Sequence, residues 1–532
     1  MSTATTHGGP AEGGERIRYG LILAHGRGDD CFPFGGASAR RAKYALEVAD
    51  VPMVRRVAES MIGAGVEDLT VTVGFEAGSV RAAMADLPAG GGVRFVEVSP
   101  FDRGDAHGLA GWFRGLPDGE HALVVNGDLV AEPADHAALV EAFLRRGGRD
   151  ALTLIDPLVD LPADPDAPAA PSGRAAVVLG SGGAILSAGA AGRPATHRLS
   201  GAHALPGSLA PRLARALAEP DARERLDLGQ ALVRLAAGGA PVHGAEALHP
   251  VVHVDHCFDY LEANLLQVER ALRRIRESRG DYVHVGGEGE PDPEWIHPGV
   301  VIAPGARVVL EEGAVISPHA TREAHLASVQ RGGRDGASIR IQGDVFLGSG
   351  ARIGFGADVG GGLYMHPGAV VEDSVVLKRV VLGPRTRVRR RGIVRKDSLL
   401  MADCLVEAGA DFEGVAGPGS SFMHPLTCFV CTGRECEVAA GNFFGFLRFD
   451  QAPASFEVRG RHITPKEPLG NATYLGDRVM TAVLVASTPG TRIGADSVVG
   501  PSVIASGRME GGHAYLPKRD LVKARLDLLR GR

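Results

Sequence analysis

Three polar segments of the N-terminal half carry side chains that suit phosphate chemistry. Gly26-Arg-Gly28 follows a short apolar run, and glycines there let main-chain N–H groups approach phosphate oxygens. Lys43 supplies a cation that could neutralise a phosphate group. Asn126-Gly-Asp128 ends another apolar run with a carboxylate, a group that holds Mg²⁺ together with phosphate oxygens. Ordinary turns and a solvated surface charge are the structural alternatives for the same residues.

The elements that must position these segments alternate between strand and helix. Apolar, β-branched runs predict strands at residues 19–24, 69–73, 93–98 and 122–125. Apolar residues at helical spacing predict helices at residues 51–64, 80–87 and 135–145. This alternation is typical of βαβ units in a mostly parallel sheet, whose ligands bind beyond the carboxyl ends of the strands. The glycine pair and the Asn-Gly-Asp segment both follow such ends.

The C-terminal half repeats every six residues. An aliphatic residue recurs at Leu347, Ile353, Val359, Met365, Val371 and Leu377. Period six with small residues between is typical of a parallel β-helix, in which each face of a coil contributes one hexapeptide. Glycines at its corners account for 74 Gly in 532 residues, about 14% against a usual share of about 7%. The repeat lapses at residues 321–339 and 404–468, where we expect loops or irregular coils.

Composition and charge argue against nucleic-acid-binding, membrane-spanning and disulfide-rich classes of protein. The chain has 57 Lys and Arg against 63 Asp and Glu, and this net charge of −6 argues against a nucleic-acid partner. No stretch reaches the ~18 uncharged apolar residues of a membrane span, so no membrane partner is expected. Six cysteines do not make a disulfide framework and favour a reducing compartment. We therefore expect a cytoplasmic protein of several domains.

These patterns divide the chain into five parts. They are a disordered leader at 1–16, an α/β domain at 17–275, a linker at 276–294, a β-helix at 295–510 and an amphipathic C-terminal helix at 511–532. The leader lacks the basic and apolar regions of a signal peptide. The linker is rich in Arg, Gly and Glu, as segments between domains often are.

Six motifs of the N-terminal half resemble, in order, those of the sugar-1-phosphate nucleotidyltransferase family. They lie at residues 21–31, 43–54, 64–73, 104–109, 124–129 and 252–264. The first is similar to the family's glycine-rich loop, the fifth to its L-x-x-N-G-D strand end and the last to its closing W-x-D segment. The resemblance implies a Rossmann-like α/β domain. It also implies transfer of a nucleotidyl group from an NTP to a sugar-1-phosphate or similar phosphorylated small molecule, with release of pyrophosphate.

The same resemblance implies roles for individual residues. Asp128 and Asp255 would hold Mg²⁺, and Lys43 would offset the charge of the sugar phosphate. The nucleotide-binding residues would be Leu23, Gly26, Gly28, Gly104, Asp105 and Ala106. His253 and His256 flank Asp255, and metal ligands, proton relays and plain surface histidines are the alternatives for them.

One departure from the family concerns the charge of the glycine-rich loop. Asp29 and Asp30 stand where the family has Thr-Arg, and that Arg faces the triphosphate. Losing such an electrostatic clamp typically costs about 100–1000-fold in rate. Arg27 would then serve as the catalytic cation, with Arg40 and Arg41 as alternatives. A catalytically degenerate, nucleotide-sugar-binding regulatory or scaffold protein is the alternative function.

The two halves together, a nucleotidyltransferase domain followed by a left-handed β-helix, resemble one bifunctional family. It is the N-acetylglucosamine-1-phosphate uridyltransferase/glucosamine-1-phosphate acetyltransferase family. Gly470–Asp477 is similar to its G-H-L-T-Y-L-G-D motif, with Asn471 in place of the general-base histidine. An amide cannot take up that proton at neutral pH. Asn442, Asn471 and Tyr474 would line an acyl or sugar pocket for acetyl-CoA or another acyl-CoA, so an acyltransferase is a third alternative.

The β-helix half holds three further candidate features. Cys428, Cys431 and Cys436 have part of the spacing of Zn²⁺ ligands, with buried thiols as the alternative. Arg385–Arg395 contains six arginines, which could bind a phosphorylated ligand or a partner's carboxylates, or simply face solvent. Since β-helices of this type commonly associate along their flat faces, we expect a homo-oligomer, with a trimer favoured.

Overall fold

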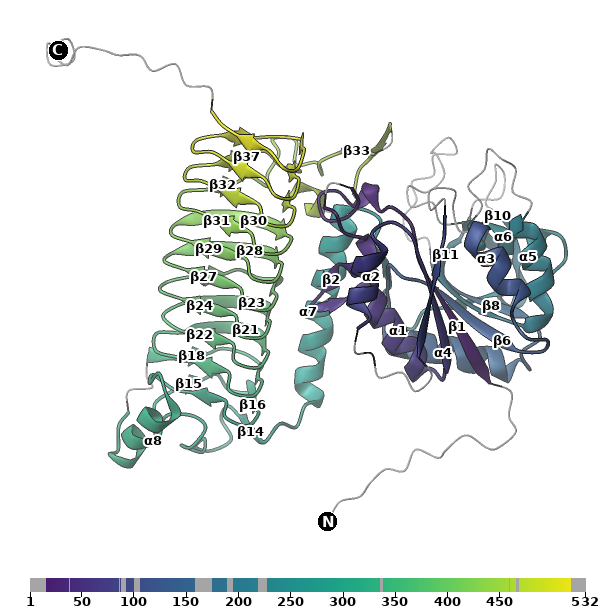
Figure 1. Cartoon of the computed structure of the whole chain (residues 1–532). Helices are drawn as coiled ribbons and strands as arrows, with labels where there is room; N and C mark the ends of the chain where they lie inside the picture. The colour runs from purple at the N-terminus through teal and green to yellow at the C-terminus, as the bar shows by residue number, and fades with distance from the viewer. Residues whose placement is uncertain are drawn as a thin grey trace, which may run out of the picture. The chain divides into compact units, whose positions relative to one another are not determined.

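The computed structural model describes residues 16–37, 39–85, 87, 92–99, 106–157, 175–188, 195–218, 227–334, 338–458, 460–465 and 468–517. The chain divides into two compact units, Met1–Ala263 and Asn264–Arg532 (Figure 1). Among the helices of these described residues, none combines the length and apolarity that a bilayer crossing requires.

The first unit is built on a nine-stranded sheet. Its main path runs β10-β9-β11-β6-β1-β4-β5, with β8 paired to β11 and β12 paired to β8. The central pairs of β1 with β4 and β6, and of β4 with β5, are parallel, while β11 is antiparallel to its neighbours. The strands are β1 (Ile17–Ala24), β4 (Asp68–Val73), β5 (Val93–Glu97), β6 (His121–Asn126), β8 (Ala151–Pro157), β9 (Ala176–Leu179), β10 (Ile185–Ala188), β11 (His197–Leu205) and β12 (Val242–Glu246).

Helices pack on both faces of this sheet. They are α1 (Met53–Gly63), α2 (Ala77–Ala83), α3 (Ala106–Arg114), α4 (Pro133–Arg145), α5 (Ala210–Ala218) and α6 (Leu228–Ala237). A further helix, α7 (Cys257–Glu277), begins in the first unit and ends in the second. Side chains alternate along a strand, so Ile22 and Ala24 of β1 face the core under α1 and α4, whereas Leu21 and Leu23 face the core under α3, α5 and α6. The continuous apolar sequence of β1 is therefore that of a strand buried on both faces.

A short antiparallel pair joins two distant segments of the first unit. β13 (Val252–His253) pairs with β7 (Leu129–Val130), so that His253 lies opposite Leu129. The Val254 N–H continues the pairing by donating to the Asp128 carbonyl at 3.1 Å. The segments that follow β6 and β13 are thereby held side by side.

The second unit is a parallel β-helix, which confirms the predicted fold class. Ile353 pairs with Val371, and Val388 pairs with Val406, which are steps of 18 residues or three hexapeptides, while the step from Val371 to Val388 is one residue shorter. Five of the predicted aliphatic positions, from Leu347 to Val371, are fully buried in one continuous core. The sixth, Leu377, belongs to a strand, but its side chain is outside the described part of the chain.

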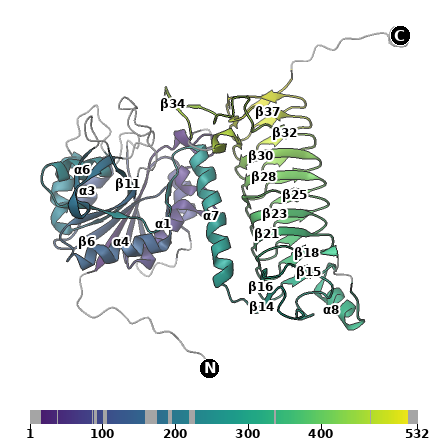
Figure 2. The ribbon, with the colours of Figure 1, turned by 180° about the vertical axis from the view of Figure 1, so that it is seen from behind.

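The coils contribute strands to two sheets, and Figure 2 labels strands of the larger one. One contains β17 (Val315–Ile316), β20 (Arg352–Ile353), β22 (Val370–Val371), β24 (Arg387–Arg389), β27 (Leu405–Glu407), β29 (Ser421–Met423), β31 (Glu437–Val438), β36 (Met480–Thr481), β39 (Val498–Val499) and β42 (Ala514–Tyr515). The other contains β14 (Tyr282–Val285), β15 (Val301–Ile302), β16 (Arg307–Leu310), β18 (Arg340–Ile341), β19 (Val345–Leu347), β21 (Asp358–Met365), β23 (Val375–Leu382), β25 (Ile393–Val394), β26 (Ser398–Leu400), β28 (Ala410–Ala416), β30 (Leu426–Thr432), β32 (Phe443–Phe444), β35 (Thr473–Leu475), β37 (Ala486–Ser487), β38 (Arg492–Ile493), β40 (Ile504–Ala505) and β41 (Arg508–Met509).

The segment predicted as a linker, 276–294, is built into the second unit. α7 continues to Glu277, and β14 then pairs antiparallel with β16 as the first strand of the larger sheet. At the other end, β42 lies where the C-terminal helix was predicted to begin, and residues 518–532 are outside the described chain, as are residues 1–15 of the predicted leader. The sequence did not predict β14 because this strand has only four residues and lies within a charged segment.

The predicted lapses of the repeat differ from each other in structure. The first contains α8 (Arg322–Gln330). In the second, the coils continue with 16 residues instead of 18, since Val406 pairs with Phe422 and Phe422 with Val438. Only the part after Phe444 leaves the coils, and it includes the hairpin of β33 (Phe456–Val458) and β34 (Arg461–Ile463). Shorter coils with phenylalanine at the buried position had hidden the period.

The predicted arginine cluster is a set of ion pairs between successive coils. Arg385 lies 2.5 Å from Asp403, Arg389 lies 2.7 Å from Glu407, and Arg395 lies 2.6 Å from Asp411. These partners are 16 or 18 residues apart because a β-helix stacks each position on the equivalent one of the next coil. The three arginines therefore already have carboxylate partners within the chain. Partly exposed ion pairs of this kind contribute about 0–1 kcal/mol each to the free energy of unfolding.

Candidate active site

The loop after β1 packs closely against Lys43 and Tyr44. The Gly26 N–H donates to the Tyr44 hydroxyl at 3.2 Å. Gly28 has a φ of +69°, and a Cβ there would lie 2.9 Å from Cβ and Cγ of Lys43. The carbonyl of the buried Leu23 accepts a hydrogen bond from the Gly127 N–H at 2.9 Å. Gly26 thus allows close approach to Tyr44, and Gly28 allows close approach to Lys43. Binding of phosphate oxygens by this loop stays a prediction.

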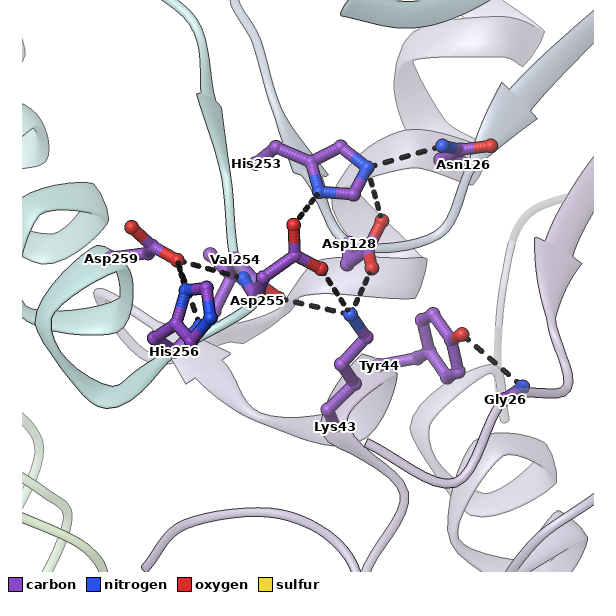
Figure 3. A network of polar contacts seen from close by, with 10 residues as sticks. All are labelled: Gly26, Lys43, Tyr44, Asn126, Asp128, His253, Val254, Asp255, His256 and Asp259. Atoms are coloured by element: carbon purple, nitrogen blue, oxygen red, sulfur yellow. Dashed lines mark hydrogen bonds and ion pairs between the residues drawn. The ribbon is translucent and has the colours of Figure 1, made fainter. Parts of the chain in front are cut away.

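Lys43 lies between the two predicted metal carboxylates (Figure 3). Its Nζ is 2.5 Å from Oδ2 of Asp128 and 2.9 Å from Oδ1 of Asp255, and it donates to the Val254 carbonyl at 3.2 Å. Burial by itself lowers the pKa of Lys43, but the carboxylates of Asp128 and Asp255 outweigh it and raise this pKa well above its ordinary value. The lysine is therefore charged and only 8% exposed.

His253 contacts the same two carboxylates from another side (Figure 3). Its Nδ1 lies 3.2 Å from Oδ2 of Asp255, and its Nε2 lies 3.1 Å from Oδ1 of Asp128 and 3.1 Å from Nδ2 of Asn126. The ligand atoms of Asp128, His253 and Asp255 lie within 4.8 Å of one another, so they can hold a metal ion together. Asp128 Oδ1 is buried and accepts no hydrogen bond from the described residues.

His256, the other histidine beside Asp255, has a different role. Asp259 Oδ2 accepts from its Nδ1 at 3.0 Å and from the main-chain N–H groups of Asp255 and His256 at 3.0 and 2.7 Å. Burial lowers the pKa of His256, but the Asp259 carboxylate outweighs it and leaves a net rise. His256 therefore fixes the chain at the start of α7, while His253 belongs to the carboxylate cluster.

Arg27 forms an ion pair with the residue that departs from the family pattern. Its Nε lies 2.9 Å from Asp29 Oδ2, and its guanidinium lies over the Phe75 ring at 5.9 Å. Asp29 also accepts a hydrogen bond from the Ala37 N–H at 3.0 Å. Arg41, an alternative cation, is buried 3.3 Å from Glu47. Asp29 thus bonds within the loop and neutralises Arg27.

The remaining nucleotide-binding candidates fall largely outside the described chain. Gly104 and Asp105 are not among the described residues. Ala106 begins α3, but its side chain is not described.

The three residues expected to line an acyl or sugar pocket are buried and bonded within the second unit. Asn442 donates to Thr481 Oγ1 at 2.7 Å and accepts from the Val485 N–H at 2.6 Å. Asn471 accepts from the Ala454 N–H at 2.7 Å, and the Tyr474 hydroxyl donates to the Leu469 carbonyl. Their polar atoms are thus used in packing the coils and the insertion, and the lining of an acyl or sugar pocket by these side chains stays a prediction.

The cysteines of the β-helix whose side chains are described are buried thiols. Cys436 donates to the Gly476 carbonyl at 3.0 Å, and burial raises its pKa to about 12, whereas zinc binds the thiolate. Cys431 is also buried, and the Cys428 side chain is not described. Within the described residues, the groups of three potential metal ligands include no cysteine, so the Zn²⁺ expectation has no support.

Sequence reasoning missed two members of the cluster around Asp128. His253 was weighed mainly as a surface histidine, and Asn126 only as part of a turn, yet His253 is 6% exposed. The available signal was the strand period of two, because residues 253 and 255 point to the same side of an extended segment. No such signal exists for Tyr44, whose contact with Gly26 depends on the path of the loop.

Comparison with known proteins finds a family model that is similar to this part of the chain. Residues 20–283 match the family model described as the MobA-like NTP transferase domain, just under half of the chain. This match confirms the resemblance to nucleotidyltransferases that the motifs predicted. The bifunctional protein GlmU of Methanococcus maripaludis strain C7 is 28% identical over 90 residues, which are 17% of this chain and only 21% of that protein.

Two solved structures are similar to about half of the chain. UDP-glucose pyrophosphorylase from Acinetobacter baumanii has a TM-score of 0.39 at 14% identity, covering 48% of this chain and 94% of that one. The inositol-1-phosphate CTP transferase from T. maritima has a TM-score of 0.37 at 16% identity, covering 46% of this chain and 92% of that one.

Proposed function

We propose that the nucleotidyltransferase domain of residues 20–283 transfers a nucleotidyl group from an NTP to a sugar-1-phosphate or similar phosphorylated small molecule, releasing pyrophosphate. The observation that carries this proposal is the buried cluster of Lys43, Asp128 and Asp255 beside the glycine-rich loop. Cations and carboxylates at the carboxyl end of a parallel sheet are suited to binding and orienting phosphate groups.

The reaction needs positioning and charge neutralisation and no protein nucleophile. A phosphate oxygen of the sugar-1-phosphate attacks the α-phosphorus of the NTP in line, and the bond to the leaving pyrophosphate breaks. A divalent cation such as Mg²⁺ would bind and neutralise the phosphate oxygens. Oδ1 of Asp128 is buried and accepts no hydrogen bond from the described residues, and it fits such a cation because a buried carboxylate oxygen without such a bond is costly in the protein interior.

The Lys43 ammonium is the group of this cluster that would contact the phosphate of the sugar substrate. Two carboxylates and one ammonium leave the cluster with a net charge of −1 when His253 is neutral, which attracts a cation and repels phosphate. The Lys43 Nζ has three donors, all directed to oxygen atoms of Asp128, Val254 and Asp255. Exchange of one of these partners for a phosphate oxygen would orient the sugar phosphate for attack.

The test is product formation by the full chain. Each of the four NTPs would be incubated with Mg²⁺ and a panel of sugar-1-phosphates, and the products identified by mass spectrometry. We expect one nucleotide-sugar to accumulate in amounts equal to the pyrophosphate released. Absence of any nucleotide-sugar over the whole panel would contradict the proposal.

The scaffold alternative is favoured by one observation, the ion pair of Arg27 with Asp29. This pair neutralises the loop cation that would face the triphosphate. A protein of this kind would be stabilised thermally by a nucleotide-sugar and would release no pyrophosphate, so the same assay with a melting curve separates the two functions.

A further inference from the structure

Two helices of the first unit, α5 and α6, line a surface pocket outside the carboxylate cluster. The helices pack against each other (Figure 1). The pocket has a volume of about 400 Å³, and its described lining residues are Arg212, Arg215, Ala216, Arg234 and Leu235. This volume is within the range of about 300–1,000 Å³ that is usual for small-molecule sites. None of these lining residues belongs to the candidate active site.

The packing of α5 places two arginines side by side at the surface. Leu213 and Leu217 of α5 are buried in the core beneath the helix, so the opposite face of α5 points outward. Arg212 and Arg215 lie on that exposed face, three residues apart. Residues at this spacing on a helix are neighbours, with Cβ atoms about 5–6 Å apart. The two guanidinium groups can therefore contact one ligand together.

The positive charge of this pocket is not balanced by its lining. Arg212 and Arg215 form no hydrogen bond or ion pair within the described part of the chain. By contrast, Arg385 and Arg389 of the β-helix lie 2.5 and 2.7 Å from carboxylates of the next coil. Arg234 of α6 adds a third guanidinium group, and the described lining residues include no acidic side chain. Three cations around a concave surface repel one another and attract an anion.

The types of the lining residues indicate which anion fits. A guanidinium group offers two parallel N–H donors to a phosphate group, and such charge-assisted hydrogen bonds are about twice as strong as those between neutral groups. Two neighbouring arginines suit two linked phosphate groups better than a single one. The half-buried Ala216 and Leu235 add an apolar wall beside the arginines.

From this geometry we infer that the pocket between α5 and α6 binds a small molecule with a diphosphate group. Arg212 and Arg215 hold this group from α5, and Arg234 holds it from α6. The site is separate from the candidate active site and does not depend on the proposed function. A diphosphate group occurs in free pyrophosphate and in nucleoside diphosphates, and the apolar wall favours the nucleotide.

The test measures binding to the full chain without divalent cations. The carboxylate cluster then has a net charge of −1 when His253 is neutral, and it repels phosphate groups. Orthophosphate, pyrophosphate and the four nucleoside diphosphates would be titrated calorimetrically at an ionic strength of about 0.15 M, which screens weak surface attraction. The variant is Arg212→Gln/Arg215→Gln. The matched control is Arg146→Gln/Arg149→Gln, which removes two exposed arginines at the same spacing.

We expect pyrophosphate to bind at least about tenfold more tightly than orthophosphate, because the second phosphate group adds charge-assisted hydrogen bonds. The Kd for pyrophosphate should weaken at least about tenfold in Arg212→Gln/Arg215→Gln and change less than about twofold in the control. Tighter binding of a nucleoside diphosphate than of pyrophosphate would identify the nucleotide as the ligand, and the reverse order would identify free pyrophosphate. Equal weakening in the two variants, or no binding of any diphosphate, would overturn the inference.

Chemical modification provides a second measurement in the unaltered protein. Phenylglyoxal reacts with exposed guanidinium groups, and mass spectrometry locates the modified residues. With pyrophosphate at about ten times its Kd, the modification rates of Arg212 and Arg215 should fall about tenfold, while that of Arg146 stays the same. Equal rates with and without pyrophosphate would overturn the inference, whether or not the variants fold. Because no sugar phosphate or metal ion is present, failure of nucleotidyl transfer would leave these results unchanged.

Discussion

The Lys43 ammonium and the Asp128 carboxylate form an ion pair of 2.5 Å in the interior of the first unit, between the loop after β1 and the end of β6. Asp255 completes the pair from a segment more than 120 residues further along the chain. A charge arrangement of this kind costs desolvation free energy, and removal of one member leaves the others uncompensated.

Lys43→Met is therefore expected to destabilise the first unit. Loss of the ammonium leaves the buried carboxylate of Asp128 and the partly buried carboxylate of Asp255 without their cation, at a cost of about 3–5 kcal/mol. Urea unfolding of the variant should show a lower midpoint than that of the exposed control Lys378→Met. Lower pH should partly restore the variant, because protonation removes the uncompensated charge. Equal midpoints for the two variants would contradict a structural role of the ion pair.

The buried His136 predicts a loss of stability in mild acid. Burial lowers its pKa from 6.5 to about 4, and its Nδ1 is 2.7 Å from Ser60 Oγ. Since the unfolded chain takes up this proton first, the stability is fully present above pH 6.5 and is lost as pH falls toward 4, by about 3 kcal/mol in all. His136→Gln should reduce the difference between urea midpoints at pH 7 and pH 5. An unchanged difference would show that His136 is not the titrating group.

Gly28 and Gly119 provide a matched pair for the glycine-rich loop. Both have positive φ, +69° and +82°, but a Cβ at Gly28 would meet the Lys43 side chain at 2.9 Å, while a Cβ at Gly119 has nothing within 4 Å. Alanine at either position would strain the backbone to a similar extent, because both positions have positive φ. Only Gly28→Ala should displace Lys43, and we expect pyrophosphate release to fall by about 10–100-fold. A similar fall in both variants would attribute the effect to general strain.

Arg27 tests whether the loop still supplies charge to the leaving group. If its guanidinium exchanges Asp29 for the triphosphate, Arg27→Gln should lower kcat by about 100-fold, as loss of an electrostatic clamp does. Arg18→Gln, which removes an exposed pair with Glu67, is the control. An unaltered kcat in Arg27→Gln would remove this residue from the proposed machinery.

The sequence was sufficient for the two folds because both depend on local periodicity. β1 and the buried aliphatic row from Leu347 to Val371 follow from strand and hexapeptide patterns. The four-residue strand β14 and the 16-residue coils around Phe422 could not be predicted in this way. A short or irregular element contains too few repeats to show a period.

The candidate site was predictable only in part. Motif order brought together Lys43, Asp128 and Asp255, which geometry then shows to be in contact. The partners of Asn442 and Tyr474 come from segments whose distance in space no motif expresses, so their pocket role was not a safe prediction.

Pyrophosphate release by the full chain tests the central proposal most directly. The rate would be measured with both substrates, with each alone, and in Asp128→Asn, with Asp150→Asn as a carboxylate control outside the cluster. The account predicts release that requires both substrates, persists in Asp150→Asn and falls by at least about 100-fold in Asp128→Asn. Release without the sugar phosphate, or equal release in Asp128→Asn and the unaltered protein, would contradict it.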